Sequence, residues 1–95
     1  MHYHSDRDER KRELSSLIGE IMEITDTTRP RICHLMYKRL QEELNVSLDA
    51  YLDVVRAETG IRDLTTFDVI VRIDRFYDAA VDLCDYVIEK NTLFG

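Results

Sequence analysis

The sequence predicts an all-α fold, a small bundle of about four helices of which the last is long. The apolar residues recur every three or four positions, which is the period of a helix with one buried side. Only three glycines and one proline occur in 95 residues, so few turns interrupt the chain. The hydrophobic fraction of 44% and the charged fraction of 34% are typical of a globular domain rather than a disordered chain.

A chain of 95 residues is the size of one domain, so we expect residues 1–95 to form a single helical domain with residues 1–4 as a flexible tail. No apolar run approaches the roughly 20 residues of a membrane-spanning helix. The opening MHYHSDRDERKRE also lacks the apolar stretch of a secretory signal. We therefore expect a cytoplasmic protein that does not contact a membrane.

The first helix is predicted to begin at Ser5, because a serine hydroxyl can accept a hydrogen bond from a first-turn amide and acidic residues follow it. Gly19 lies within the apolar pattern and marks either a close helix crossing or a tolerated small residue. The apolar side of this helix comprises Leu14, Leu17, Ile18, Ile21, Met22 and Ile24.

The second helix is predicted from Arg29 to Leu44. Thr28 is a suitable N-cap, and Pro30 lies in the first turn, where an amide would have no partner. The expected core side of this helix comprises Ile32, Leu35, Met36, Leu40 and Leu44, with Cys33 and Tyr37 at its flank.

A third helix is predicted from Leu48 to about Thr59, capped by Ser47 and closed by Gly60, which can adopt positive φ. Asn45 or Val46 ends the preceding helix. The residues expected to face inward are Leu48, Tyr51, Leu52 and Val55.

Residues 66–89 are predicted to form one long helix. Their apolar residues follow one helical stripe, although β-branched residues make a short strand over 67–73 a competing interpretation. The stripe comprises Phe67, Ile70, Ile73, Tyr77, Ala80, Cys84, Val87 and Ile88.

This last helix also carries acids at intervals of three and four residues, which places them on one face. Like charges at this spacing repel, so the face is a candidate contact for a basic surface. A solvated face without a partner is the alternative. The acidic residues are Asp74, Asp78, Asp82, Asp85 and Glu89.

Residues 29–40 contain four positive and no negative side chains, whereas the net charge of the chain is −6. We expect a basic face formed by Arg31, His34, Lys38 and Arg39, which is a solvated face, a contact for an acidic protein surface or a contact for nucleic acid. The negative net charge makes nucleic-acid binding the less favoured of these.

Apolar residues at the chain's end exceed what one helix stripe can hold, which predicts self-association through the last helix. We expect a homodimer with a seam at Ile70, Ile73 and Tyr77. The surplus residues are Phe67, Val69, Val71, Phe76, Tyr86, Leu93 and Phe94.

No metal site, cofactor or catalytic residue is expected. His2 and His4 lie in the predicted tail, and the adjacent Cys33 and His34 point about 100° apart on a helix. No catalytic motif is present, so we expect a protein that is not an enzyme. Cys33 and Cys84 belong to no CxxC pair, and we expect both to be reduced core residues, with a disulfide as the alternative.

The strings RICHLMYKRLQEELNVSLDAYL and FYDAAVDLCDYVIE resemble the C-terminal domain of phage antirepressor and related phage regulatory proteins. The chain departs from that pattern by its longer stretch between Val54 and Ile73 and by lacking a separate N-terminal domain. The resemblance covers about half the chain and implies a phage or prophage module that grips a protein partner or oligomerises. The matching residues are Ile32, Tyr37, Leu40, Val46, Ser47, Phe76 and Ala79 or Ala80.

We therefore expect an interaction module, a phage-type regulator or inhibitor that binds a protein partner through its charged faces. One alternative is an inhibitor whose acidic helix mimics nucleic acid and blocks a nucleic-acid-binding enzyme. Another is a dimeric helical transcription regulator that binds DNA.

Overall fold

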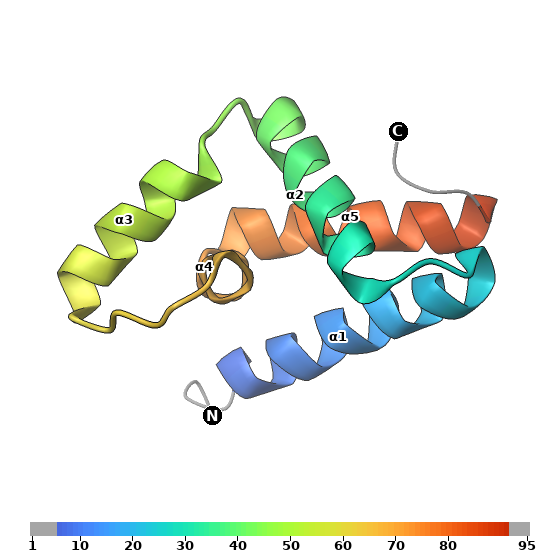
Figure 1. Ribbon diagram of the computed structural model, residues 1–95, viewed down its shortest axis with the longest axis horizontal. Coiled ribbons are helices and arrows are strands. Elements are labelled where there is room, and N and C mark those ends of the chain that lie inside the picture. The colour runs from blue at the N-terminus through green and yellow to red at the C-terminus, as the bar shows by residue number, and fades with distance from the viewer. Residues whose placement is uncertain (1–5, 92–95) are drawn as a thin grey trace.

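The computed structural model describes residues 6–91, which form five α-helices and no strand (Figure 1). The predicted all-α class is confirmed, and the last helix is long; the number of helices is five instead of about four. The predicted tail, the Ser5 cap, Leu93 and Phe94 lie outside the described residues. The helices are α1 (Asp6–Thr25), α2 (Arg29–Leu44), α3 (Leu48–Thr59), α4 (Thr66–Arg72) and α5 (Asp74–Lys90).

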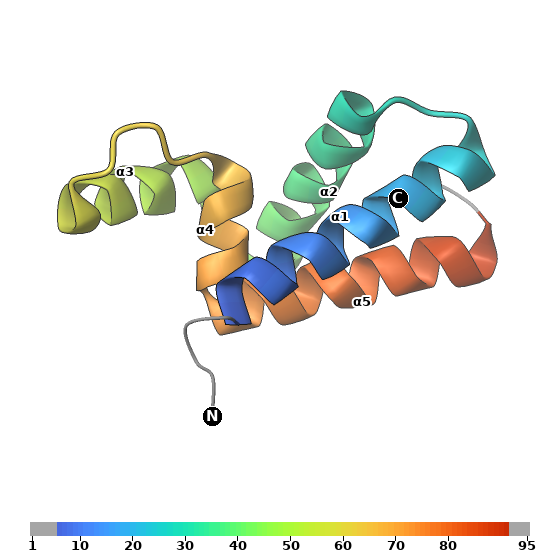
Figure 2. The ribbon, with the colours of Figure 1, turned by 90° about the horizontal axis from the view of Figure 1, so that it is seen from below.

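The helices α1 and α5 lie side by side and run in the same direction (Figures 1 and 2). Helix α2 packs against both of them, and α4 contacts α1, α3 and α5. Helix α3 lies to one side of this group and packs mainly on α4. The α5 helix therefore packs on α1, α2 and α4, and Tyr51 of α3 also contacts it, with its ring centroid 4.9 Å from that of Phe76.

One hydrophobic core joins all five helices. Two predicted core residues are not in it, since Leu35 is only half-buried and Ile24 is 39% exposed at the end of α1. The residues that are 0% exposed within the core cluster are Leu14, Ile18, Ile21, Ile32, Met36, Leu40, Val69, Ile70, Phe76, Ala80, Cys84 and Val87.

The predicted ends of α2 and α3 are confirmed. Ser47 Oγ accepts a hydrogen bond from the Ala50 amide at 3.3 Å. Asn45 and Gly60 close α2 and α3 in the left-handed region, with φ of 54° and 74°. Thr28 has the extended backbone of an N-cap, but its side chain makes no capping bond.

The predicted single helix over 66–89 is wrong, and so is the competing strand. Ile73, with φ −103° and ψ 117°, is an extended residue that separates α4 from α5. The apolar period continues through this residue, which is why the sequence pattern conceals the break.

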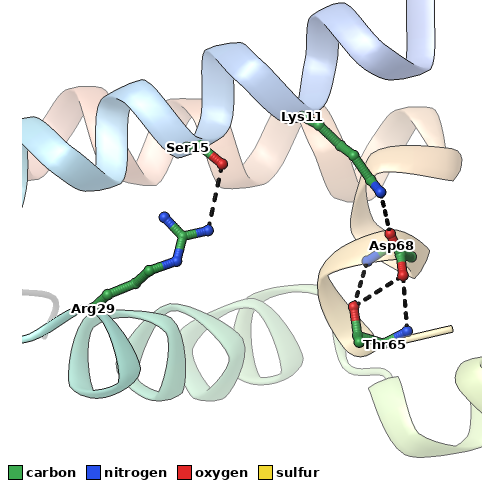
Figure 3. A network of polar contacts seen from close by, with 5 residues as sticks. All are labelled: Lys11, Ser15, Arg29, Thr65 and Asp68. Carbon is green, nitrogen blue, oxygen red and sulfur yellow. Dashed lines mark hydrogen bonds and ion pairs between the residues drawn. The ribbon is translucent and has the colours of Figure 1, made fainter. Parts of the chain in front are cut away.

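A polar network fixes the start of α4 against α1 (Figure 3). Thr65 and Asp68 form a capping box, in which the Asp68 carboxylate accepts from the Thr65 amide at 3.0 Å. Lys11 of α1 pairs with the same carboxylate at 2.8 Å. Nearby, Arg29 at the start of α2 donates to Ser15 Oγ of α1 at 3.4 Å. Two helix starts are therefore tied to α1 by side-chain contacts.

Replacing Asp68 with asparagine should make the free energy of unfolding less dependent on pH in the acidic range. Burial alone would raise the pKa of Asp68, but the hydrogen bonds from Lys11 and Thr65 outweigh it and hold that pKa below its ordinary value. The stabilisation is therefore present above the ordinary carboxyl pKa and is lost as pH falls through the lowered folded pKa. Asp68→Asn should lower the free energy of unfolding by about 1 kcal/mol at pH 7.

Urea unfolding from about pH 7 down to pH 2 measures this difference, which should shrink towards zero at the acidic end. Asp63→Asn is the control, because Asp63 is exposed and forms no hydrogen bond or ion pair within residues 7–91. A difference that stays constant with pH would contradict the assignment.

Replacing Gly19 with alanine should stabilise the protein. Gly19 lies inside α1, and a Cβ placed there has no atom within 4 Å, so the close helix crossing considered for it is absent. Glycine costs about 1 kcal/mol relative to alanine inside a helix. Thermal unfolding should therefore show a Tm higher by roughly 4–8 °C. A lowered Tm would mean that the site is more crowded than its surroundings indicate.

Candidate interaction surface

Helix α5 presents one acidic face to solvent. At about 100° of rotation per residue, its five acids fall within a sector of about 80°. This sector lies opposite the side that Ala80 and Cys84 bury in the core. All members of the acidic face are exposed: Asp74, Asp78, Asp82, Asp85 and Glu89.

Little of this negative charge is neutralised within the chain. Arg10 of α1 pairs with Asp74 at 2.8 Å, and the other four acids have no ion pair among residues 7–91. Arg75, three residues before Asp78, is engaged elsewhere: its Nη2 donates to Tyr51 Oη at 3.1 Å and its guanidinium lies over Phe76. The negative charge of the acidic face is therefore left to interact with another molecule.

Tyr86 lies beside the acidic face and was not predicted as a site residue. It is 55% exposed, four residues after Asp82 and three before Glu89. An exposed aromatic ring next to charges can bury a large apolar area when a partner arrives, as interface anchors do. The sequence did contain a signal for its exposure: on the helix circumference Tyr86 lies next to Asp82 and outside the sector that faces the core.

The predicted basic face on α2 is only partly assembled. Arg31, His34 and Lys38 are exposed within a sector of about 60°. Arg39 lies about 100° from Lys38, outside this sector, and its Nε pairs with Glu43 at 3.3 Å, so its part in a basic face stays a prediction. Glu42 is exposed about 20° beyond Arg31, at the border of this sector, so the basic face carries less positive charge than expected.

The predicted dimer seam is not on the surface. Ile70 is 0% exposed, Tyr77 is 8% exposed, and Ile73 is half-buried against the same core. These residues pack on α1 and on other helices of the same chain, which supply the neighbours that the sequence pattern left unassigned. Among the surplus apolar residues, Val69, Val71 and Phe76 are also 0% exposed. The physical argument for a seam at these positions is therefore lost, while the oligomeric state stays a prediction.

The hydroxyl of Tyr77 and the thiol of Cys84 both have raised pKa values. The Tyr77 hydroxyl donates to the Glu13 carboxylate. The pKa of Tyr77 is raised chiefly by burial and, to a smaller extent, by this contact. Burial also raises the pKa of the Cys84 thiol to about 12, and the negative charge of Asp85 adds to this. Both cysteines are free, and Cys84 Sγ lies 3.9 Å from Met36 Sδ.

In the part of the chain that the structure describes, no three metal-binding side chains gather. His2 and His4 lie outside that part. No helix among the described residues has the length and apolar character needed to cross a membrane.

Comparison with protein-family models, curated proteins and solved structures found no match for this chain. The resemblance to phage antirepressor-type domains therefore stays a prediction. The candidate site consists of the acidic face of α5 with Tyr86 beside it.

The two cysteines should react at very different rates in the folded protein. Cys84 is 0% exposed and its thiol has a raised pKa, whereas Cys33 is half-buried. Since the thiolate is the reactive form, a disulfide reagent at pH 8 should modify Cys33 at least about tenfold faster. Cys33→Ser should leave only the slow phase, and both sites should react equally in guanidinium. Two equally fast sites in the folded protein would contradict the burial of Cys84.

Proposed function

We propose that the protein is a non-enzymatic interaction module, which binds a basic surface of a partner protein through the acidic face of α5 and Tyr86. The observation that carries this proposal is the gathering of five exposed acids in one sector, four of them without an ion pair among residues 7–91. Like charges three and four residues apart destabilise a helix by a few tenths of a kcal/mol per pair. Stability alone would favour alternating charges at these positions.

The two parts of this surface have different roles in binding. The acids attract and orient a positively charged partner, which chiefly raises the rate of association. Tyr86 supplies apolar area and a ring face on which an arginine or lysine of the partner can stack. A partner surface with basic residues around a small apolar recess fits this arrangement.

A regulatory or inhibitory role in a phage or prophage setting is part of the proposal. It is supported by the resemblance of residues 31–52 and 76–89 to antirepressor-type domains. Among the matching residues Ser47 alone is exposed and the others, such as Ile32 and Phe76, are buried or half-buried, so the resemblance concerns the frame of the domain more than its surface. The partner would be a regulator or an enzyme of the host or the phage.

Charge spacing favours a protein partner over the role of a nucleic-acid mimic. Along α5 the acids follow one another at about 5 Å of helix axis, whereas duplex DNA carries one charge per about 1.7 Å. The field of α5 is therefore much weaker than that of the duplex it would imitate. A role in binding DNA is also less favoured, since Glu42 dilutes the basic face of α2.

The test compares two variants that lose the same number of negative charges. The first neutralises the unpaired acids of α5, with Asp78→Asn, Asp82→Asn, Asp85→Asn and Glu89→Gln. The control neutralises exposed acids on α1 and α3, with Glu20→Gln, Glu23→Gln, Asp49→Asn and Asp53→Asn. Wild type and control should capture the same partner from host lysate at about 50 mM salt and lose it as salt rises, and the α5 variant should capture none.

The α5 variant should also be at least as stable as wild type in urea, because the repulsion along the helix is relieved. Loss of binding then has no explanation in unfolding. Equal capture by the α5 variant and the wild type would reject the acidic face as the site. A captured protein that DNA displaces would point instead to the mimic.

A further inference from the structure

The joint between α4 and α5 is bent without any residue that breaks helices. Ile73 is the only residue between the two helices, and its backbone is extended. The stretch Thr66–Lys90 contains neither glycine nor proline, and its apolar period continues through the joint. Sharp bends in helices usually occur at a residue that breaks the helix, such as proline or glycine. The cause of this bend therefore lies elsewhere in the fold.

Arg10 of α1 makes the contacts that the bend requires. In a continuous helix the Val71 carbonyl would accept from the Arg75 amide. In the structure Arg10 Nη1 donates to that carbonyl at 3.0 Å, and Nη2 donates to Asp74 Oδ1 at 2.8 Å. The guanidinium also lies 4.8 Å from the centroid of the Tyr77 ring. One side chain thus holds the last turn of α4 and the first turn of α5.

The bent joint leaves backbone donors that a continuous helix would use. Within the described residues, the amides of Asp74 and Arg75 have no backbone acceptor, while those of Phe76 and Tyr77 bond to the Ile73 carbonyl. Joining α4 to α5 would pair these two free amides with the carbonyls of Ile70 and Val71. The bent and the continuous forms therefore satisfy different backbone groups, and Arg10 contributes only to the bent one.

We propose that the α4–α5 joint has two states, and that Arg10 is the positioning residue that holds it bent. When Arg10 releases, α4 and α5 form one helix, and the buried side of α5 leaves its own α1 and α2. A second copy of the chain supplies an identical pair of helices to cover that side, so the open form is an exchanged dimer. A connection of only one residue between two helices favours such exchange, because a short hinge restricts how the two helices can pack on each other within one chain.

The test removes the cation with Arg10→Gln, using Arg12→Gln as the matched control. Arg12 lies on the same helix, is exposed and makes no hydrogen bond or ion pair within residues 7–91. Amide hydrogen exchange at Asp74 and Arg75 should slow by roughly tenfold in Arg10→Gln, and light scattering should show several times more dimer. The control should behave as wild type in both measurements.

The sign of the exchange effect separates the proposal from simple destabilisation, which would make exchange faster. Unchanged or faster exchange at both amides in folded Arg10→Gln would overturn the proposal. If that variant does not fold, Arg10→Lys takes its place, because a single ammonium cannot serve Val71 and Asp74 as the guanidinium fork does. Slower exchange in Arg10→Lys would support the two states. Unchanged exchange, or failure of both variants to fold, would reject them.

Discussion

The packing of α5 against α1, α2 and α4 together is the constraint on which the rest of the structure depends. It fixes the rotation of α5, because Phe76, Ala80 and Cys84 must all be covered. The acids then have one place left, the opposite side of the helix. The rotation of α5 about its own axis therefore determines both which residues are buried and where the acids point. A change in the buried side would reorient the acidic face as well.

The elements whose limits are set by neighbouring residues could be predicted from the sequence. Pro30, Ser47 and Gly60 act within one turn of their own positions, and the limits of α2 and α3 follow from them. The exposure of the acidic residues also follows from the helical period. These features depend only on contacts between residues that are close in the chain.

The features that depend on distant contacts could not be predicted. The bend at Ile73 involves Arg10, which is 61 positions from its acceptor Val71. The burial of Tyr77 could not be predicted for the same reason, since its contact with Glu13 of α1 joins residues 64 positions apart. Tyr86 was overlooked because it was counted as surplus apolar area, although its place on the helix circumference separates it from the core. Amphipathic pattern shows which side of a helix is buried and leaves open what buries it.

The parallel arrangement of α1 and α5 has a consequence for how the protein is made. Arg10 and Asp74 are 64 positions apart, so α1 is synthesised long before the helix that covers it. Until then Leu14, Ile18 and Ile21 have only the helices of the middle segment to contact. Contacts at such separation cost loop-closure entropy and slow the final step of folding. The core of the described residues is therefore completed only once α5 has been made, and α1 is the helix that waits longest for its cover.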